Sequence, residues 1–197
     1  MQVANSKEHI GDIILNLRKN DTSIGFVPTM GALHKGHLSL IKKALQENDV
    51  VFVSIFVNPT QFDNKKDLKN YPRTLDRDLE LLKTVSDSKI FVYAPTVEDI
   101  YGKHPKAKRF DFDGLENEME GEFRGGHFDG VGTIVKRLFE IVTPDRAYFG
   151  EKDFQQLQII RKLVDKNNLP VKIAVSYTHL TLPTICFKCR SRWSPYH

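Results

Sequence analysis

An α/β fold with a largely parallel, doubly wound sheet is predicted by the alternation of strand-like and helix-like segments along this chain. Residues 24–29 form a short apolar run that ends at a proline and a threonine. Residues 36–47 then place apolar side chains at helical spacing. Residues 50–57 are apolar nearly throughout, as are strands that helices cover on both faces.

The other elements continue this alternation. Helices are expected over residues 6–17, with Ser6 as the N-cap, and over 75–85, 131–142 and 153–167. Strands are expected over residues 89–94, 146–149 and 171–175. Residues 103–126 are irregular, polar and rich in glycine, with one short strand candidate over residues 109–112.

The position of a ligand site follows from the predicted sheet. In doubly wound sheets, ligands bind beyond the carboxyl ends of the strands, at the point where the strand order reverses. The loops that follow Thr29, Val57 and Phe149 are therefore where functional side chains are expected.

Charge and hydropathy exclude several classes of protein. The formal net charge is +4, but residues 176–197 hold three basic residues and no acidic one, so the rest carries only +1. Such a balance lacks the clustered positive charge that nucleic-acid binding requires. The longest apolar run, residues 50–57, is far shorter than the roughly 20 residues that span a bilayer. Residues 1–20 mix charged and apolar side chains, so no signal peptide is expected.

The last residues differ from the rest in composition. Residues 176–197 show no clear periodicity, and residues 175–184 resemble the translation of a sequencing adaptor. We expect one domain over residues 1–175, followed by a tail over 176–197 that is an artefact of cloning or sequence assembly. Both cysteines, Cys186 and Cys189, lie in this tail, so a redox or zinc site there is a remote alternative. The absence of cysteine before the tail fits a reducing compartment, the cytoplasm.

The loop after the first long strand carries the strongest functional signal. His34 and His37 are three residues apart at the start of a helix, so both imidazoles lie on one side of its first turn. Free backbone amides and the helix dipole favour an anion there, so the pair could hold a phosphate and neutralise a leaving pyrophosphate. The alternative is a capped helix start with two solvated histidines.

Two further polar segments follow later strands. Gln61, in residues 58–62, could bind a small substrate that carries hydroxyl and carboxylate groups, although an Asn-Pro turn explains the segment equally. In residues 150–156, Lys152 could place a cation on phosphate, and Asp153 could cap the helix or hold a ribose hydroxyl. Gln156 lies one turn further along, and a solvated helix start is the alternative here.

Two other groups are ambiguous. Asp76 and Asp78 flank Arg77 in a helical stretch, where charged side chains are usually only solvated. His127, in a glycine-rich approach to a helix, could face the site or serve as a hydrogen-bonded structural histidine.

Five segments together carry a family resemblance: residues 29–37, 58–62, 71–74, 126–130 and 148–156. In order and spacing they are similar to the pantothenate synthetase (pantoate–β-alanine ligase) family. This family belongs to the His-x-Gly-His nucleotidyltransferase superfamily, so the resemblance implies a Rossmann-like ATP-binding domain, a smaller C-terminal domain and a cytoplasmic homodimer. It implies that ATP and Mg²⁺ drive the joining of pantoate to β-alanine through a pantoyl adenylate, with release of AMP and pyrophosphate.

The resemblance also implies roles for single residues. It makes His37 a proton donor, with His34 its companion and Lys152 on the phosphates. Gln61 matches a residue that contacts pantoate and β-alanine, and Gln156 matches a pantoate ligand. Asp78 matches one magnesium-associated acid, although Arg77 stands where a second acid can occur. The ATP-lining residues are Met30, Gly31, Ala32, Leu33, His34, Lys35, Gly36, His37, Gly150, Glu151, Lys152 and Asp153.

The resemblance ends near residue 173. The family continues with a Ser-Ser-Arg-Asn loop over the ATP phosphates and with the C-terminal domain, and neither is recognisable in this sequence. The expectation is therefore a chain that binds ATP but turns over poorly. Two alternatives stay open: a nucleotidyltransferase of the same superfamily, and a nucleotide-binding fragment without turnover.

Overall fold

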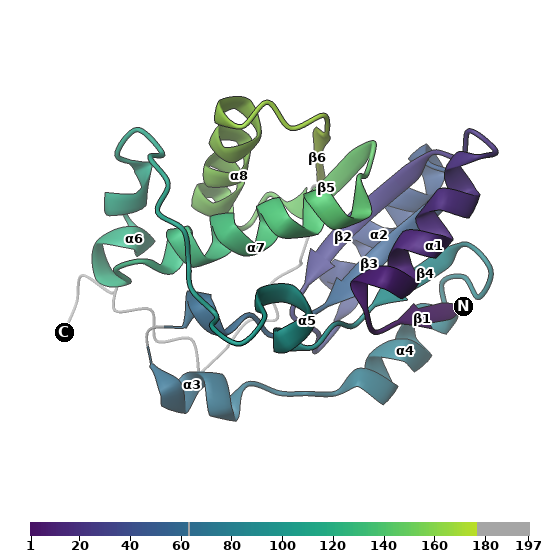
Figure 1. The fold of residues 1–197 in the computed structure, drawn as a ribbon, viewed down its shortest axis with the longest axis horizontal. Helices are drawn as coiled ribbons and strands as arrows, with labels where there is room; N and C mark the ends of the chain where they lie inside the picture. Colours follow the sequence, from purple (N-terminus) through teal and green to yellow (C-terminus); the bar gives the residue numbers. More distant parts are fainter. Residues whose placement is uncertain (63, 177–197) are drawn as a thin grey trace, which may run out of the picture.

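The computed structural model describes residues 1–62 and 64–176, which form one six-stranded sheet flanked by helices (Figure 1). Every strand pairs in parallel with its neighbours. The strands, in spatial order, are β1 (Gln2–Ala4), β4 (Ile90–Tyr93), β3 (Val50–Ile55), β2 (Ile24–Thr29), β5 (Arg146–Gly150) and β6 (Lys172–Ser176). The strand order reverses between β2 and β5, which confirms the predicted doubly wound sheet.

Helices cover both faces of the sheet. One face carries α1 (Lys7–Arg18), α5 (Val97–Tyr101), α7 (His127–Val142) and α8 (Phe154–Lys166), and the other carries α2 (Lys35–Glu47) and α4 (Leu75–Lys83). Shorter helices lie in the connections: α3 (Lys65–Asn70), α6 (Glu120–Phe123) and the 3-10 turns η1 (Pro59–Gln61) and η2 (Leu115–Asn117).

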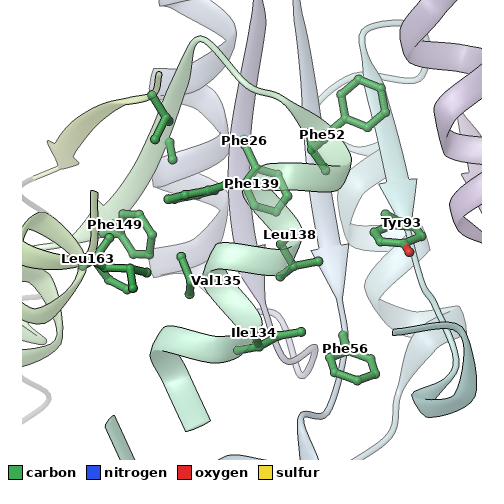
Figure 2. Close-up of a cluster of buried hydrophobic side chains, with 14 of the residues drawn as sticks. Phe26, Phe52, Phe56, Tyr93, Ile134, Val135, Leu138, Phe139, Phe149 and Leu163 are labelled. Atoms are coloured by element: carbon green, nitrogen blue, oxygen red, sulfur yellow. The ribbon is translucent and has the colours of Figure 1, made fainter. Parts of the chain in front are cut away.

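Two hydrophobic clusters hold these layers together. Along β2, Phe26 packs into the cluster beneath α7 and the next residue, Val27, into the cluster beneath α2, as the alternation of a strand requires. Figure 2 shows the first cluster, in which Phe26 meets Phe139 of α7 edge to face, with ring centroids 6.2 Å apart. Both clusters also contain buried aliphatic side chains. Close packing on both faces holds the sheet in place, and the sheet positions the loops at its ends.

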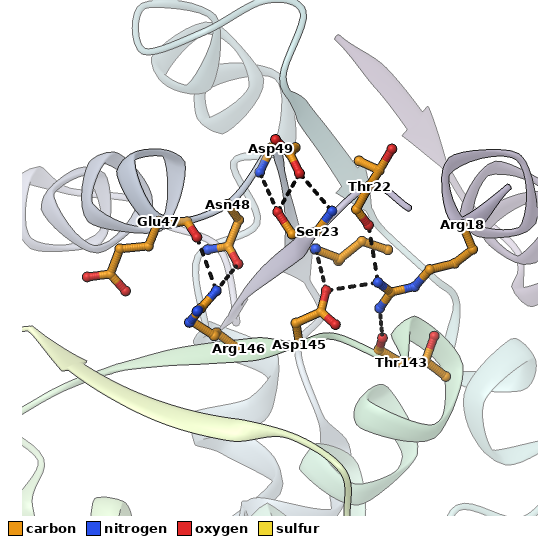
Figure 3. Close-up of polar contacts among 10 residues, drawn as sticks. Arg18, Thr22, Ser23, Glu47, Asn48, Asp49, Thr143, Asp145 and Arg146 are labelled. Atoms are coloured by element: carbon orange, nitrogen blue, oxygen red, sulfur yellow. Dashed lines mark hydrogen bonds and ion pairs between the residues drawn. The ribbon is translucent and has the colours of Figure 1, made fainter. Parts of the chain in front are cut away.

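A polar network fixes the amino-terminal edge of the sheet (Figure 3). The Asp145 carboxylate, just before β5, accepts hydrogen bonds from the Ile24 backbone nitrogen at 2.7 Å and from Arg18 at 2.8 Å. Arg18 also donates to the carbonyl of Thr143. The network ties the start of β2 to the start of β5, so the carboxyl ends of these two strands emerge side by side at the opposite edge.

The predicted elements are confirmed with small shifts in their ends, and Ser6 caps α1 by accepting from the His9 nitrogen. The strand candidate over residues 109–112 is wrong. The backbone nitrogens of Lys108 and Phe110 donate to side chains of α7, Thr133 and Asp129, and so are not available to a strand partner. The short elements β1 and α5 were not predicted, because three and five residues give little periodicity.

Helix α7 begins at His127, four residues earlier than predicted. Among the described residues, the structure contains no helix with the length and apolar character needed to cross a membrane. The expected tail, residues 176–197, lies outside the described residues except for Ser176, the last residue of β6.

Candidate functional site

A cavity of about 220 Å³ opens at the carboxyl ends of β2, β3 and β5, where the strand order reverses. It is the place that the sheet topology predicts for a ligand. The three loops expected to carry function all contribute to it. Its lining consists of Pro28, Thr29, Met30, Gly31, His37, Leu40, Phe56, Asn58, Gln61, Tyr71, Val131, Ile134, Val135, Leu138, Tyr148, Phe149, Gly150, Asp153 and Gln156.

The structure brings together only part of the predicted site. The predicted residues that line the cavity are Met30, Gly31, His37, Gln61, Gly150, Asp153 and Gln156. The predicted residues outside its lining are Ala32, Leu33, His34, Lys35, Gly36, Glu151, Lys152 and Asp78. Of these, Leu33 is buried in the core beneath α2, so its side chain supports the loop rather than a ligand.

The loop between β2 and α2 is held in an unusual conformation. Gly31 and Ala32 are both left-handed, with φ of 83° and 51°. The expectation of free amides in this loop is largely wrong, because its backbone nitrogens already donate within the chain. Gly31 donates to Thr29 Oγ1 at 3.1 Å, and Gly36 donates to His34 Nδ1 at 3.1 Å. Binding of an anion at this loop would therefore depend more on side-chain donors than on the loop backbone.

The two histidines lie against each other at the start of α2. Their ring centroids are 4.0 Å apart and the ring planes are inclined by 31°. His34 is the N-cap, and its Nδ1 accepts from Gly36; His37 Nδ1 accepts from the His34 backbone nitrogen at 3.4 Å. Because each Nδ1 acts as an acceptor, the ring hydrogen of each neutral imidazole lies on Nε2. Both rings are thus arranged as Nε2–H donors.

The electrostatics of His37 favour its neutral form. Burial, followed by the neighbouring His34, lowers the pKa of His37 to about 4, and the Asp78 carboxylate opposes this shift. At neutral pH, His37 is therefore an uncharged hydrogen-bond donor in the cavity. A bound phosphate would add negative charge and raise this pKa again.

Gln61 is oriented by the turn that precedes it. Asn58, only 1% exposed, donates from Nδ2 to Gln61 Oε1 and to the carbonyl of Gly130, both at 3.1 Å. Asn58 Oδ1 in turn accepts from the Tyr101 hydroxyl at 2.6 Å. The Gln61 amide nitrogen lies 3.1 Å from Met30 Sδ, across the cavity wall. Both the oxygen and the nitrogen of the Gln61 side-chain amide therefore have a contact within the protein. These contacts hold the amide in the cavity lining, where it can hydrogen-bond to a polar ligand.

Helix α7 supports the same turn from behind. A Cβ on Gly130 would lie 2.3 Å from the Thr60 carbonyl oxygen, so only glycine allows this approach. His127 is buried, and its Nδ1 lies 2.8 Å from the Gln61 carbonyl oxygen. Of the two interpretations of His127, the structure supports the hydrogen-bonded structural one.

The loop after β5 contributes less than predicted. Lys152 is exposed at the start of α8, outside the cavity lining. Asp153 occupies the N-cap position of α8, but its side chain makes no capping hydrogen bond, so the capping role is wrong and its side chain lines the cavity. Gln155 and Gln156 divide their tasks. Gln155 is buried against backbone groups of residues 115–120, and Gln156 faces the cavity.

Asp78 is buried, although the charged side chains around it led us to expect that it would be solvated. Its carboxylate is 1% exposed and accepts from the nitrogens of Ala32 at 2.9 Å and Leu33 at 2.8 Å, and from Thr74 Oγ1 at 3.3 Å. Mg²⁺ takes octahedral oxygen ligands and usually keeps several waters. A buried carboxylate with both oxygens on donors does not fit that requirement. In the described part of the chain, no three His, Cys, Asp or Glu side chains gather as metal ligands.

An apolar wall of the cavity was missed from the sequence. Val131, Ile134, Val135 and Leu138 of α7 line it together with Phe56. Their helical spacing is that of any core-facing helix, so the sequence offers no signal that this face also meets a ligand. The candidate thiol pair, Cys186 and Cys189, lies outside the described residues.

Comparison with known proteins agrees with this geometry. The family model described as pantoate-beta-alanine ligase matches residues 2–182. A pantothenate synthetase from Christiangramia forsetii is 60% identical over 88% of this chain and 61% of its own length. One from Flavobacterium psychrophilum is 66% identical over 79% of this chain and 55% of its own length. The chain thus spans about three fifths of the length of these relatives.

Solved structures give the same result. The pantothenate synthetase of Thermus thermophilus superposes with a TM-score of 0.82 at 41% identity, over 90% of this chain and 62% of that one. The pantoate-beta-alanine ligase of Francisella tularensis, solved with beta-gamma ATP and beta-alanine, also gives 0.82, at 43% identity over 90% of this chain and 67% of that one. The fold, the cavity at its switch point and these matches agree, and the chain belongs to the pantoate–β-alanine ligase family.

Proposed function

We propose that this chain forms the ATP- and pantoate-binding part of an enzyme that joins pantoate to β-alanine. The observation that carries the proposal is the cavity that gathers His37, Gln61 and Gln156 at the switch point of the sheet. The lining of this cavity combines apolar side chains of α7 with two amides and an imidazole. Pantoate also combines both kinds of group: a central dimethyl carbon lies between a hydroxymethyl group and a carbon that bears a hydroxyl and the carboxylate.

The proposed reaction has two steps. A carboxylate oxygen of pantoate attacks the α-phosphorus of ATP, and the bond to the bridging oxygen breaks, so pyrophosphate leaves and pantoyl adenylate forms. The amine nitrogen of β-alanine then attacks the acyl carbon and loses a proton, while the bond to the adenylate oxygen breaks and AMP leaves. Both steps build negative charge on phosphate oxygens, so fixed donors are the main requirement for catalysis.

The residues of the cavity fit these tasks. The Gln61 and Gln156 amides would hold the polar groups of pantoate against the α7 wall. His37, neutral at pH 7, would donate from Nε2 to a phosphate oxygen, with His34 stacked beside it. Lys152 would reach the phosphates from the start of α8, where its exposed side chain has room to move. Mg²⁺ would neutralise phosphate charge, and we propose that it is bound through phosphate oxygens and water rather than through Asp78.

The family resemblance further suggests a cytoplasmic homodimer, and we propose both for this chain. The Francisella tularensis relative solved with beta-gamma ATP and beta-alanine supports the choice of ligands. Sedimentation at several protein concentrations would test the dimer, and a single species at the mass of one chain would exclude it.

The decisive experiment follows isotope exchange between pyrophosphate and ATP. Exchange should depend on pantoate and should not occur with phosphopantetheine, which a related nucleotidyltransferase would use. Direct titrations of ATP and of pantoate, run in parallel, report binding where turnover is slow. Absence of pantoate binding, or exchange that ignores pantoate, would exclude the proposal.

A further inference from the structure

Asp78 reaches the β2–α2 loop from a helix that is far away in sequence. It lies in the first turn of α4, 45 and 46 residues after the two backbone nitrogens that it accepts from. These nitrogens belong to Leu33 and Ala32, the two residues directly before the N-cap His34. One buried carboxylate therefore holds the segment that leads into the histidine pair.

The conformation of this segment needs such a partner. The left-handed conformation is unfavourable for a residue other than glycine, and Ala32 has φ of 51°. Gly31 is also left-handed, so two successive residues of the loop have positive φ. The Asp78 oxygens lie 2.8 and 2.9 Å from the nitrogens of Leu33 and Ala32 and so occupy both of these donors. These two amides are therefore not available to a phosphate, which leaves its binding to other donors such as the His37 side chain in the cavity lining.

We propose that Asp78 is a positioning residue, which clamps the Ala32–Leu33 backbone so that His34 and His37 are presented to the ATP phosphates, and that it is not a magnesium ligand. This inference rests on the proposed binding of ATP at the loop. The clamp itself, however, is a property of the protein without ligand. It can therefore be tested separately from ATP binding.

The first measurement is amide hydrogen exchange without nucleotide, on this chain and on Asp78→Asn. The asparagine turns one acceptor into an NH₂ group, which cannot accept from a backbone nitrogen. Exchange at Ala32 and Leu33 should rise about tenfold or more, which corresponds to the loss of one charge-assisted hydrogen bond. Asp76→Asn is the matched control, because Asp76 is exposed in the same helical turn. In this variant the Ala32 and Leu33 amides should exchange as fast as in the parent. Unchanged exchange at both amides in Asp78→Asn would overturn the clamp.

The second measurement is an ATP titration of the same three proteins, with saturating Mg²⁺ and with EDTA. Loss of a negative charge near phosphate would by itself tighten ATP binding, whereas loss of the clamp should weaken it, by about tenfold in both conditions. A loss seen only with Mg²⁺ would identify Asp78 as a metal ligand and overturn the proposal, as would tighter binding. If the parent binds no ATP, the proposed function fails, and the exchange data still decide the clamp.

Should Asp78→Asn fail to fold, Asp78→Glu addresses the same question. It keeps the charge but moves the carboxylate by one methylene, so the two amides should again exchange about tenfold faster. Protection equal to that of the parent would overturn the proposal.

Discussion

The imidazole rings of His34 and His37 lie 4.0 Å apart at the start of α2, each with its Nδ1 accepting from a backbone nitrogen. The arrangement fixes both rings and leaves each Nε2 as a donor. Of the two, only His37 lines the cavity, so in the proposed reaction it is the ring that would contact the phosphate. His34 caps the start of α2 and lies against the His37 ring.

Replacing His37 by alanine should slow pantoate-dependent pyrophosphate exchange by roughly 10²–10³-fold, as for the loss of one fixed donor to developing charge. The affinity for ATP should change much less, because the contact strengthens in the transition state. His104→Ala is the control, since that side chain is exposed and does not line the cavity. Exchange within twofold of the parent in His37→Ala would show that the ring only binds.

The lowered pKa of His37 predicts a pH dependence of stability. Its pKa is about 4 in the folded chain and 6.5 in the unfolded one, so the unfolded chain binds more protons between these values. The contribution of neutral His37 to the free energy of unfolding is complete above pH 6.5 and is lost as the pH falls towards 4. Urea unfolding measures the free energy of unfolding of the parent and of His37→Gln. As the pH falls through this window, the parent should lose about 2–3 kcal/mol relative to His37→Gln. A constant difference between the two proteins would contradict the shifted pKa.

The two cavity glutamines should determine pantoate affinity. Leucine at Gln61 or Gln156 leaves polar groups of the substrate without partners, at roughly 1–3 kcal/mol each, which weakens pantoate binding by about 5- to 150-fold. ATP binding should change little. Gln155→Leu is the contrasting variant, because that buried amide holds the 115–120 segment and should lower stability instead. An equal loss of pantoate and ATP binding in the cavity variants would point to misfolding rather than to recognition.

What the sequence could predict is set by how local each signal is. The run of residues 50–57 and the periodicity of residues 36–47 depend only on neighbouring residues, so β3 and α2 were correctly predicted. Asp78 shows the opposite case. Its neighbours Asp76 and Arg77 are charged, and only contact with a loop 45 residues away makes it a buried acceptor. The strand candidate at residues 109–112 failed for the same reason, since α7 side chains take its donors.

The close approach of α7 to the Gln61 turn predicts that Gly130→Ala is harmful. The atoms nearest to the new Cβ would be backbone atoms, at 2.3 Å for the Thr60 oxygen and 2.8 Å for the Gln61 Cα, so the helix or the turn must move. We expect a loss of about 1–3 kcal/mol in the free energy of unfolding, together with weaker pantoate binding. Gly125→Ala, with nothing within 4 Å, is the matched control. Chemical denaturation with a parallel pantoate titration measures both effects, and a Gly130→Ala protein as stable as the control would contradict this close approach.

The final prediction concerns Lys152, which is exposed and lies outside the cavity lining. If its flexible side chain reaches the phosphates of ATP, Lys152→Gln should weaken ATP binding by about tenfold, the loss of one charge-assisted contact. The effect should shrink as salt rises from about 0.05 to about 0.5 M, because an exposed ion pair is screened over roughly 4–14 Å in that range. Lys172→Gln removes the same charge from the start of β6, at the other edge of the sheet, and should leave ATP affinity unchanged. Titration calorimetry at the two salt concentrations separates a phosphate contact from a general effect of net charge. Equal weakening by both substitutions would mean that Lys152 acts only through the overall field of the protein.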